Sequence, residues 1–516
     1  MKYRHTLLLI LPFVFSYNLQ AQDDKGFEIS KNLEIFANVY KTLHQNYVDD
    51  VDPGKAMKKA IDAMLASMDP YTNYYPESDM EDVKMQLLGQ YGGVGALIHQ
   101  DEEKNIFISE PYEGLPADKA GLKAGDRIVA VNGESTEGKS NSDVSSAMRG
   151  QAGTDVAITV ERDGKRFTRT ITRKEIVLPN VPYSGMVGDK VGYVKLSEFT
   201  QDAGGNVREA FRKLKQEHPD MRGFILDLRG NGGGLMNEAV DVVNTFVRKG
   251  ELVVETKGKV AAKNMKSFTR LAPEDMQIPL VVLVDGYSAS ASEIVSGSLQ
   301  DLDRAVIVGT RSFGKGLVQE PFNFSDGSGF RLTVARYYTP SGRCIQKPYT
   351  EDYHYDIIKR YNDGEMTDAD SIKVNKDEAF YTAGGRKVYG GGGIIPDVFV
   401  PIDTTGYTDY IADCNRKSLI IKYANKVSDL HRAELRSLKD IGSVRRFVDG
   451  LNLKDGFIAY SKENGLNPTD RDWEISGNII LVQIRALVAR YTPMGDDAFY
   501  PIYLSIDNVM DEVMKK

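Results

Sequence analysis

The sequence contains only two cysteines in 516 residues, Cys344 and Cys414. Two cysteines do not imply a disulfide framework, and no Cys/His cluster with metal-ligand spacing accompanies them. We therefore expect no metal site, and no motif in the chain calls for another cofactor. The sequence leaves open whether the two thiols pair or remain free in the core.

Basic residues are fewer than acidic ones: the chain has 65 Lys and Arg and 73 Asp and Glu, which gives a formal net charge of -8. The chain also lacks a long Lys/Arg run, which a phosphate-binding face would need, so a nucleic-acid partner is not expected. Internal repeats and low-complexity tracts are missing as well. A hydrophobic content of 41% and a charged content of 27% are typical of a folded protein. The length predicts three or four domains.

No segment is apolar over the roughly 18–20 residues that a membrane-spanning helix needs. At the N-terminus, positively charged Lys2 and Arg4 precede a short apolar stretch, Leu7 to Phe15, and a plausible cleavage site at Ala21. This order is typical of a secretory signal peptide over residues 1–21, with a retained membrane anchor as the alternative. We therefore expect an exported protein, periplasmic or extracytoplasmic, that is soluble or peripherally membrane-associated.

The pattern of apolar residues divides the remaining chain into four parts and predicts a multidomain α/β protein. Residues 22–84 have helical spacing, typical of a packing or dimerisation arm, although the pattern stops at Asp69-Pro70. Residues 85–176 show short strands and short helices. In residues 177–404 apolar strands alternate with helical segments, which favours a mixed or parallel sheet. The clearest strands there are Val191 to Leu196, Gly223 to Leu228, Leu280 to Val284 and Ala305 to Val308. Residues 405–516 are predicted to be mainly helical.

A candidate nucleophile follows the strand Leu280 to Val284. The next residues read as the start of a helix, with Ser288 as a possible cap and serines also at 290 and 292. Free backbone N–H groups and a positive helix dipole favour an alkoxide nucleophile there. Spacing alone does not choose among the three serines, and a helix start made of small residues for close packing is the alternative.

A base for such a serine is not supplied by histidine. The chain has six histidines, none beside a recognisable active-site motif, and the Gly-x-Ser-x-Gly elbow is absent. Lysine is the main alternative base. Lys315 lies between Gly314 and Gly316, shortly after an apolar strand, and Gln319 follows four residues on, where it could hold the amine. A surface lysine in a glycine turn remains the competing interpretation.

A lysine base must be uncharged before it can accept a proton. With a pKa of ~10.4, fewer than about one lysine in 10³ is neutral at pH 7. Burial can lower a lysine pKa by up to ~3–5 units. The hypothesis therefore requires Lys315 to be desolvated and not paired with a carboxylate.

A glycine-rich turn, Asp227 to Gly234, follows the strand that begins at Gly223. Such a turn can present backbone N–H groups to an anion. A phosphate-binding loop is disfavoured because the Lys-Ser/Thr of that motif is absent. A flexible strand-to-helix turn is the other interpretation.

Four motifs together resemble the carboxy-terminal-processing, or tail-specific, serine peptidase family over about residues 30–400. They are Ser-Ala-Ser-Ala-Ser-Glu at 288–293, Ser-Phe-Gly-Lys-Gly-x-Val-Gln at 312–319, Leu-Arg-Gly-Asn-Gly-Gly-Gly at 228–234, and Tyr337 to Gly342. The resemblance implies that Ser290 is the nucleophile, Lys315 its base and Gln319 the residue that orients the lysine. It also implies oxyanion donors on Ala291 and on Gly232 or Gly233, and a relay role for Asp301.

Residues 85–176 resemble the PDZ domain that these proteases carry. The turn Gly93, Val94, Gly95 and Ala96 matches the loop whose N–H groups receive a chain-terminal carboxylate, and Gly121 to Ile128 matches the signature that follows it. A C-terminal tail would add a strand to the edge of this domain.

The resemblance implies a serine endopeptidase that recognises C-terminal tails and cleaves them through an acyl-enzyme, without metal or cofactor. Its partners would be proteins or peptides with accessible tails, and a homodimer and an activating adaptor are compatible with the family. Asp285 and Tyr287 depart from the residues expected before the serine run. The rival hypothesis is a PDZ-bearing tail-binding scaffold that has lost its chemistry.

Overall fold

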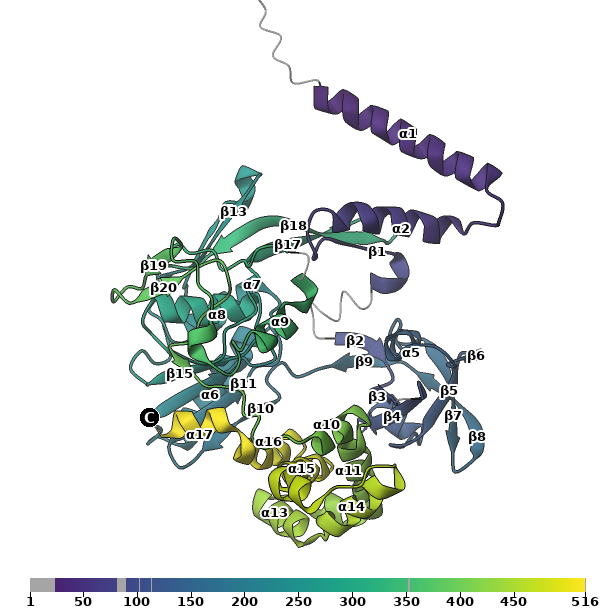
Figure 1. Cartoon of the computed structure of the whole chain (residues 1–516), viewed down its shortest axis with the longest axis vertical. Coiled ribbons are helices and arrows are strands. Elements are labelled where there is room, and N and C mark those ends of the chain that lie inside the picture. Colours follow the sequence, from purple (N-terminus) through teal and green to yellow (C-terminus); the bar gives the residue numbers. More distant parts are fainter. Residues whose placement is uncertain (1–23, 81–89, 102, 113, 351–352, 516) are drawn as a thin grey trace, which may run out of the picture. The chain divides into compact units, whose positions relative to one another are not determined.

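The computed structural model describes residues 24–80, 90–101, 103–112, 114–350 and 353–515 (Figure 1). The predicted signal peptide lies outside these ranges. Two units are distinguished, residues 1–68 and 69–516. Within the described part of the chain, no helix combines the length and the apolar character that crossing a bilayer requires.

The first unit consists of two helices, α1 (Asp24–Asn46) and α2 (Pro53–Ala66). Helix α2 begins where the sequence favours it, since Pro53 occupies the first turn and the Asp52 carboxylate accepts a hydrogen bond from the Lys55 N–H at 3.0 Å. The predicted helical segment ends earlier than residue 84. Residues 69–80 belong to the second unit and include a strand, β1 (Asn73–Tyr75), and a short 3₁₀ turn, η1 (Glu77–Asp79).

The helical pattern stops at Asp69 for a local reason. Its side chain accepts hydrogen bonds from the N–H groups of Tyr71 (2.7 Å) and Thr72 (2.9 Å), which fixes a turn in place of another helical turn. Strand β1 then pairs antiparallel with β18 (Gly329–Tyr338). Sequence periodicity could not show this pairing, because its two strands lie more than 250 residues apart.

The domain predicted to resemble a PDZ domain contains a sheet in the order β3-β4-β5-β7-β8, with β6 on β5, and a separate β2-β9 pair. Helix α5 buries Val144 and Met148 against the sheet. The elements are β2 (Gln90–Gly93), β3 (Ala96–Gln100), β4 (Ile106–Pro111), α4 (Pro116–Lys119), β5 (Arg127–Val131), β6 (Glu134–Ser135), α5 (Asn141–Met148), β7 (Asp155–Arg162), β8 (Lys165–Thr172) and β9 (Lys174–Val177). The prediction of short strands with short helices is confirmed.

The α/β domain is built on a six-stranded sheet in the order β10-β11-β12-β15-β16-β21, parallel except for β10. Its strands are β10 (Tyr183–Val187), β11 (Val191–Lys195), β12 (Gly223–Asp227), β15 (Leu280–Val284), β16 (Val306–Gly309) and β21 (Val398–Phe399). The four strands predicted from apolar runs are therefore confirmed within one residue at each end. Continuous apolar runs are expected of parallel strands that are buried on both faces.

Both faces of this sheet are covered. One face packs against α6 (Ala203–Glu217), α7 (Met236–Asn244) and α8 (Ala291–Asp301) in the largest apolar core. The other face, with Tyr193 and Ile225, forms a second core that includes Met510 of the C-terminal extension. The extension thus packs on the sheet of the α/β domain.

A second sheet carries the segment that follows Lys315. It joins β1, β18, β13 (Leu252–Gly258) and β14 (Lys266–Phe268), and β17 (Leu317–Asn323) pairs with β18. Smaller elements of the core are η2 (Ala261–Lys263), η3 (Tyr353–Tyr355), α9 (Asp356–Asn362), η4 (Ala369–Ser371), β19 (Ala379–Tyr381) and β20 (Lys387–Tyr389).

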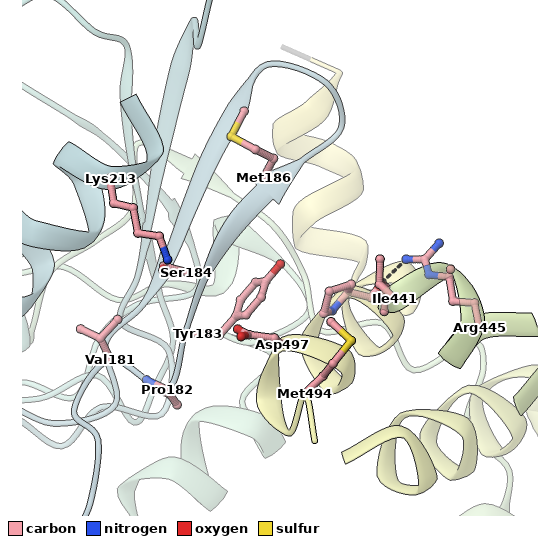
Figure 2. Close-up of a pocket in the computed structure, with 12 residues that line it drawn as sticks. Val181, Pro182, Tyr183, Ser184, Met186, Lys213, Ile441, Arg445, Met494 and Asp497 are labelled. Carbon is pink, nitrogen blue, oxygen red and sulfur yellow. Dashed lines mark hydrogen bonds between the residues drawn. The ribbon is translucent and has the colours of Figure 1, made fainter. Parts of the chain in front are cut away.

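The C-terminal region is helical, as predicted. Its elements are α10 (Asp409–Arg416), α11 (Leu419–Leu430), α12 (Arg432–Ser437), α13 (Ile441–Gly450), α14 (Leu453–Glu463), α15 (Asp470–Arg490), α16 (Asp496–Tyr503), η5 (Leu504–Ile506) and α17 (Asn508–Met514). Helices α10 to α16 enclose an apolar core of their own, whereas Met510 of α17 belongs to the core on the sheet. A cavity of about 580 Å³ lies between this region and strand β10, lined by Tyr183, Lys213, Arg445 and Asp497 among others (Figure 2).

The two cysteines are not paired: Cys344 is half-buried and Cys414 is buried in the helical core, both as free thiols.

Candidate active site

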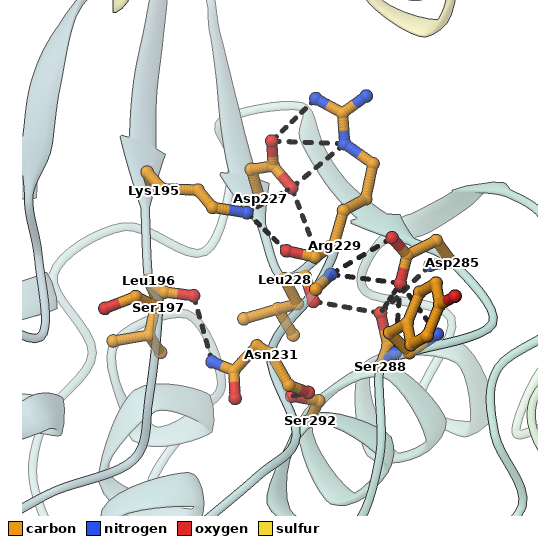
Figure 3. Close-up of polar contacts among 12 residues, drawn as sticks. Lys195, Leu196, Ser197, Asp227, Leu228, Arg229, Asn231, Asp285, Ser288 and Ser292 are labelled. Atoms are coloured by element: carbon orange, nitrogen blue, oxygen red, sulfur yellow. Dashed lines mark hydrogen bonds and ion pairs between the residues drawn. The ribbon is translucent and has the colours of Figure 1, made fainter. Parts of the chain in front are cut away.

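Three serines lie between β15 and α8, and the structure separates them. Ser288 and Ser292 are fully buried, and their hydroxyls donate to the carbonyls of Leu228 and Asn231, each at 2.9 Å (Figure 3). Ser290 is half-buried. The expectation that Ser288 caps the helix is wrong, because α8 begins only at Ala291 and the Ser288 hydroxyl is bonded elsewhere. Ser290 is therefore the serine of this turn whose surroundings suit a nucleophile.

The backbone of Ser290 is strained. Its φ of 57° and ψ of -112° fall in a region that non-glycine residues rarely occupy. Such a conformation costs of order 1–3 kcal/mol and persists only where neighbouring contacts impose it. Here the Ser290 N–H donates to the carboxylate of Glu293 at 2.9 Å, and the Ser290 carbonyl accepts from the Tyr337 hydroxyl at 3.1 Å.

The glycine turn after β12 packs directly on Ser290. A Cβ atom at Gly233, where φ is 104°, would lie 2.7 Å from the Cβ of Ser290 and 2.9 Å from the nitrogen of Ala291. The Gly233 N–H itself donates to the Asn231 side chain at 2.9 Å. The N–H groups of Gly232 and Ala291 have no hydrogen-bond acceptor among the described residues. Of the three predicted oxyanion donors, these two are available in this conformation.

Asp285 connects the glycine turn to the serine turn. Its Oδ1 atom accepts hydrogen bonds at 3.0 Å from the N–H groups of Gly230, Tyr287 and Ser288 (Figure 3). A carboxylate suits this place because it only accepts hydrogen bonds and can take several at once. The departure from the family pattern at position 285 thus stabilises the two turns that surround Ser290.

Lys315 lies in a largely desolvated place. Its Nζ atom lies 4.2 Å from the centre of the Tyr71 ring, and the Tyr71 hydroxyl bonds the Tyr353 hydroxyl at 2.7 Å. Burial, with a smaller contribution from Arg331, lowers the pKa of Lys315 to about 8, while Glu293 and Asp69 oppose the shift. Within the described ranges no carboxylate forms an ion pair with this ammonium. At pH 7 about one lysine in ten with such a pKa is neutral, against about one in 3,000 at the ordinary value.

One carboxylate joins the Ser290 and Lys315 segments. Glu293 is fully buried and accepts hydrogen bonds from Ser290 N (2.9 Å), Lys315 N (2.8 Å), Gly314 N (2.7 Å) and Ser312 Oγ (2.5 Å). The first two share the same oxygen, so the amide nitrogens of Ser290 and Lys315 lie within about 6 Å of each other. Burial raises the pKa of Glu293, and the four donated bonds oppose that rise. Because every contact is a donor, the ionised form fits this pocket.

Two other residues predicted for the site, Gln319 and Asp301, are not among those that hydrogen-bond the Glu293 carboxylate. Gln319 donates to the Thr333 hydroxyl at 3.5 Å, and the pairing of β17 with β18 shifts register between Val318 and Gln319. A bulge of this kind re-aims the side chain, and the role of Gln319 in orienting Lys315 stays a prediction. Asp301 ends α8, about 16 Å along the helix from Ser290. There it pairs with Arg343 at 2.8 Å, which is a structural contact at the opposite end of the helix.

The predicted tail-binding loop lies between β2 and β3. Val94, Gly95 and Ala96, with Ile98, Ser145, Met148 and Arg149, line a small cavity of about 20 Å³. Gly93 ends β2 beside them. Gly95 needs to be glycine, since its φ is 72° and a Cβ atom would lie 2.7 Å from Leu115. The backbone of the loop is therefore closely packed at Gly95, and its binding of a tail stays a prediction.

Two residues of the site were not predicted. Glu293 was identified only as part of the serine run, although Ser-x-x-Glu is a recognisable helix-start signal. Tyr71 gave no signal, because its partners Lys315 and Tyr353 are more than 240 residues away. No group of His, Cys, Asp and Glu able to hold a metal occurs in the part of the chain that the structure describes.

The fold and this site define a protease core that carries a PDZ domain. Comparison with known proteins agrees: the peptidase family S41 model matches residues 190–355, the PDZ domain model residues 107–162, and a family of unknown function, DUF8443, residues 410–492.

A "Carboxy-terminal-processing protease" of Bartonella bacilliformis is 37% identical over 320 residues, which are 61% of this chain and 73% of that protein. A "Probable CtpA-like serine protease" of Staphylococcus aureus is 33% identical over 349 residues, 67% and 69% of the two chains. A solved structure titled "photosystem II D1 C-terminal processing protease" shares 28% identity, with a TM-score of 0.38, over 72% of this chain and 94% of that one. The chain belongs to the carboxy-terminal-processing proteases of peptidase family S41.

Proposed function

We propose that this protein is a serine endopeptidase that cleaves exported proteins after binding their C-terminal tails, with Ser290 as nucleophile and Lys315 as base. The observation that carries the proposal is the Glu293 carboxylate, which holds both backbone segments while Lys315 is desolvated to a pKa of about 8. A base whose pKa lies near the working pH combines a useful neutral fraction with the ability to take a proton.

In the proposed reaction, neutral Lys315 accepts the hydroxyl proton while Ser290 Oγ attacks the carbonyl carbon of the scissile peptide bond. The N–H groups of Ala291 and Gly232 stabilise the oxyanion that forms. The lysine then gives the proton to the leaving amine, and an acyl-enzyme remains. Water, deprotonated by the same lysine, attacks the ester and restores Ser290.

The PDZ loop supports the choice of substrate. PDZ domains bind an extended C-terminal tail by adding it as a strand to their sheet edge, and the PDZ domain model matches residues 107–162 of this chain. Export is proposed from the N-terminal sequence pattern alone. The proposal also includes a homodimer and an activating adaptor. The mass of the purified protein in solution tests whether it forms a homodimer.

The experiment is tail cleavage by wild type, Ser290→Ala and Lys315→Ala, followed by mass spectrometry of the products. We expect cleavage by the wild type only. A substrate with an amidated C-terminus should be cut with a raised KM, because the carboxylate contact is lost. Equal cleavage by all three enzymes would refute the assignment, and tail binding without cleavage would favour the scaffold hypothesis.

A further inference from the structure

The glycine turn beside Ser290 is supported by a buried charged cluster at the end of β12. Asp227, which is 2% exposed, accepts hydrogen bonds from the Tyr193 hydroxyl at 2.7 Å and from Arg229 N at 2.8 Å. The ammonium of Lys195 donates to the Arg229 carbonyl and pairs with Asp227 at 3.3 Å (Figure 3). Burial alone would raise the pKa of Asp227, but Arg229 and Lys195 outweigh it and hold the pKa below its usual range.

The second carboxylate on Arg229 comes from Asp507, the N-cap residue of α17. Arg229 NH1 donates to Asp507 Oδ1 at 2.9 Å and NH2 to Asp507 Oδ2 at 2.7 Å. This is a bidentate contact, the strongest arrangement that a guanidinium and a carboxylate can form. The side chains of Arg229 and Asp507 are only 18% and 10% exposed. The pair is therefore more than a solvated surface contact, whose contribution would be small.

Asp507 is itself rigidly held. It caps α17 by accepting hydrogen bonds from the N–H groups of Val509 (3.0 Å) and Met510 (3.3 Å). Met510 is buried in the core on the outer face of the sheet, and Asn508 bonds the Pro401 carbonyl at 3.0 Å. The extension thus places this carboxylate at a fixed point of the protease core.

We infer that Asp507 is a positioning residue for the oxyanion-binding turn, so that the C-terminal extension completes the active site. The inference rests on the proposed function. Arg229 directly precedes Gly230 and lies three residues before Gly232, whose N–H we assign to the oxyanion. With Asp507 present, Arg229 is fixed from both sides, by Asp227 and by α17. Without that charge, one side of the guanidinium loses its partner and the turn is less well held.

The expected effect falls on the transition state. Loss of a whole oxyanion donor costs about 10²–10³ in kcat. A donor that is retained but less well held should cost less, roughly tenfold. KM should change less than about twofold, because the PDZ loop and the remaining substrate contacts are unchanged.

The test compares Asp507→Asn with Asp511→Asn in the full chain. Asparagine can still cap α17 through Oδ1, but its amide NH₂ would face the guanidinium in place of an acceptor. Asp511 lies on the same helix, is exposed, and provides the same change of charge. Asp507→Ser is a second variant that keeps the cap and is too short to reach Arg229.

The inference predicts that Asp507→Asn and Asp507→Ser lower kcat roughly tenfold per titrated active site, while Asp511→Asn matches the wild type. A kcat equal to that of Asp511→Asn would overturn it. So would a loss that disappears once the rates are normalised to the fraction of folded enzyme. A failure of the proposed function gives a different result. In that case the Ser290→Ala variant, with Asp507 intact, would still cleave the substrate.

Discussion

Replacing Glu293 by glutamine probes the contact that joins the segments of Ser290 and Lys315, the proposed nucleophile and base. Glutamine has one acceptor oxygen in place of two, so its NH₂ group must face one pair of the four donors. The less costly orientation turns NH₂ toward Ser312 Oγ and Gly314 N, since a hydroxyl can also accept a hydrogen bond. The bonds from Ser290 N and Lys315 N are then kept.

The magnitude follows from this count. One buried backbone donor, Gly314 N–H, loses its acceptor, which costs about 1–3 kcal/mol of stability. A second effect is electrostatic: the Glu293 charge raises the pKa of Lys315, so its removal should lower that pKa further. The acidic limb of the pH profile of kcat/KM should therefore move to lower pH in Glu293→Gln.

The assays are urea unfolding and peptide cleavage between pH 5 and 9. Glu238→Gln is the matched control, because Glu238 is also buried and accepts a backbone hydrogen bond, from Gly204 at 3.0 Å, but lies on α7. It should leave the pH profile unchanged. The reasoning is refuted if Glu293→Gln unfolds like the wild type, or if its acidic limb moves to higher pH.

Three further results are expected. In the wild type, kcat/KM should rise about tenfold per pH unit below pH 8 and level off above it, because only neutral Lys315 is active; a profile flat from pH 6 to 8 would contradict this. Folding lowers the pKa of Lys315, so the unfolded chain binds more protons between about pH 8 and 10.5 and stability rises with pH in that window. Lys315→Met should abolish this rise and be more stable at pH 7 by up to about 3 kcal/mol in urea unfolding; equal pH dependence in both proteins would refute the desolvation. Gly233→Ala should lose activity because its Cβ would clash with Ser290, whereas Gly232→Ala, which has open space, should keep it; equal turnover in the two variants would show that the close packing is unimportant.

The parts of the fold that depend on local pattern could be predicted from the sequence. The parallel strands are continuous apolar runs with clear ends, and the PDZ loop and glycine turn depend on glycines in conformations that other residues avoid. Helical periodicity was equally visible in residues 405–516, including the region around Ile480 and Ile484. Each of these features is determined by residues that lie close together in the sequence.

The features that were missed depend on contacts between distant residues. Tyr71 reaches Lys315 and Tyr353 only after the chain folds, and Asp507 meets Arg229 across 278 positions. Spacing in the sequence also does not reveal a backbone irregularity such as the register shift between Val318 and Gln319. Spacing alone does not distinguish the three serines, whereas in the structure Ser288 and Ser292 are fully buried and Ser290 is half-buried with a positive φ.

The most direct measurement is to trap the enzyme during turnover of a tail peptide by rapid acid quench and to locate the acyl group by peptide mapping. The account predicts an ester on Ser290 in the wild type and no adduct in Lys315→Ala. An acyl group on another residue, or an undiminished adduct in Lys315→Ala, would contradict it.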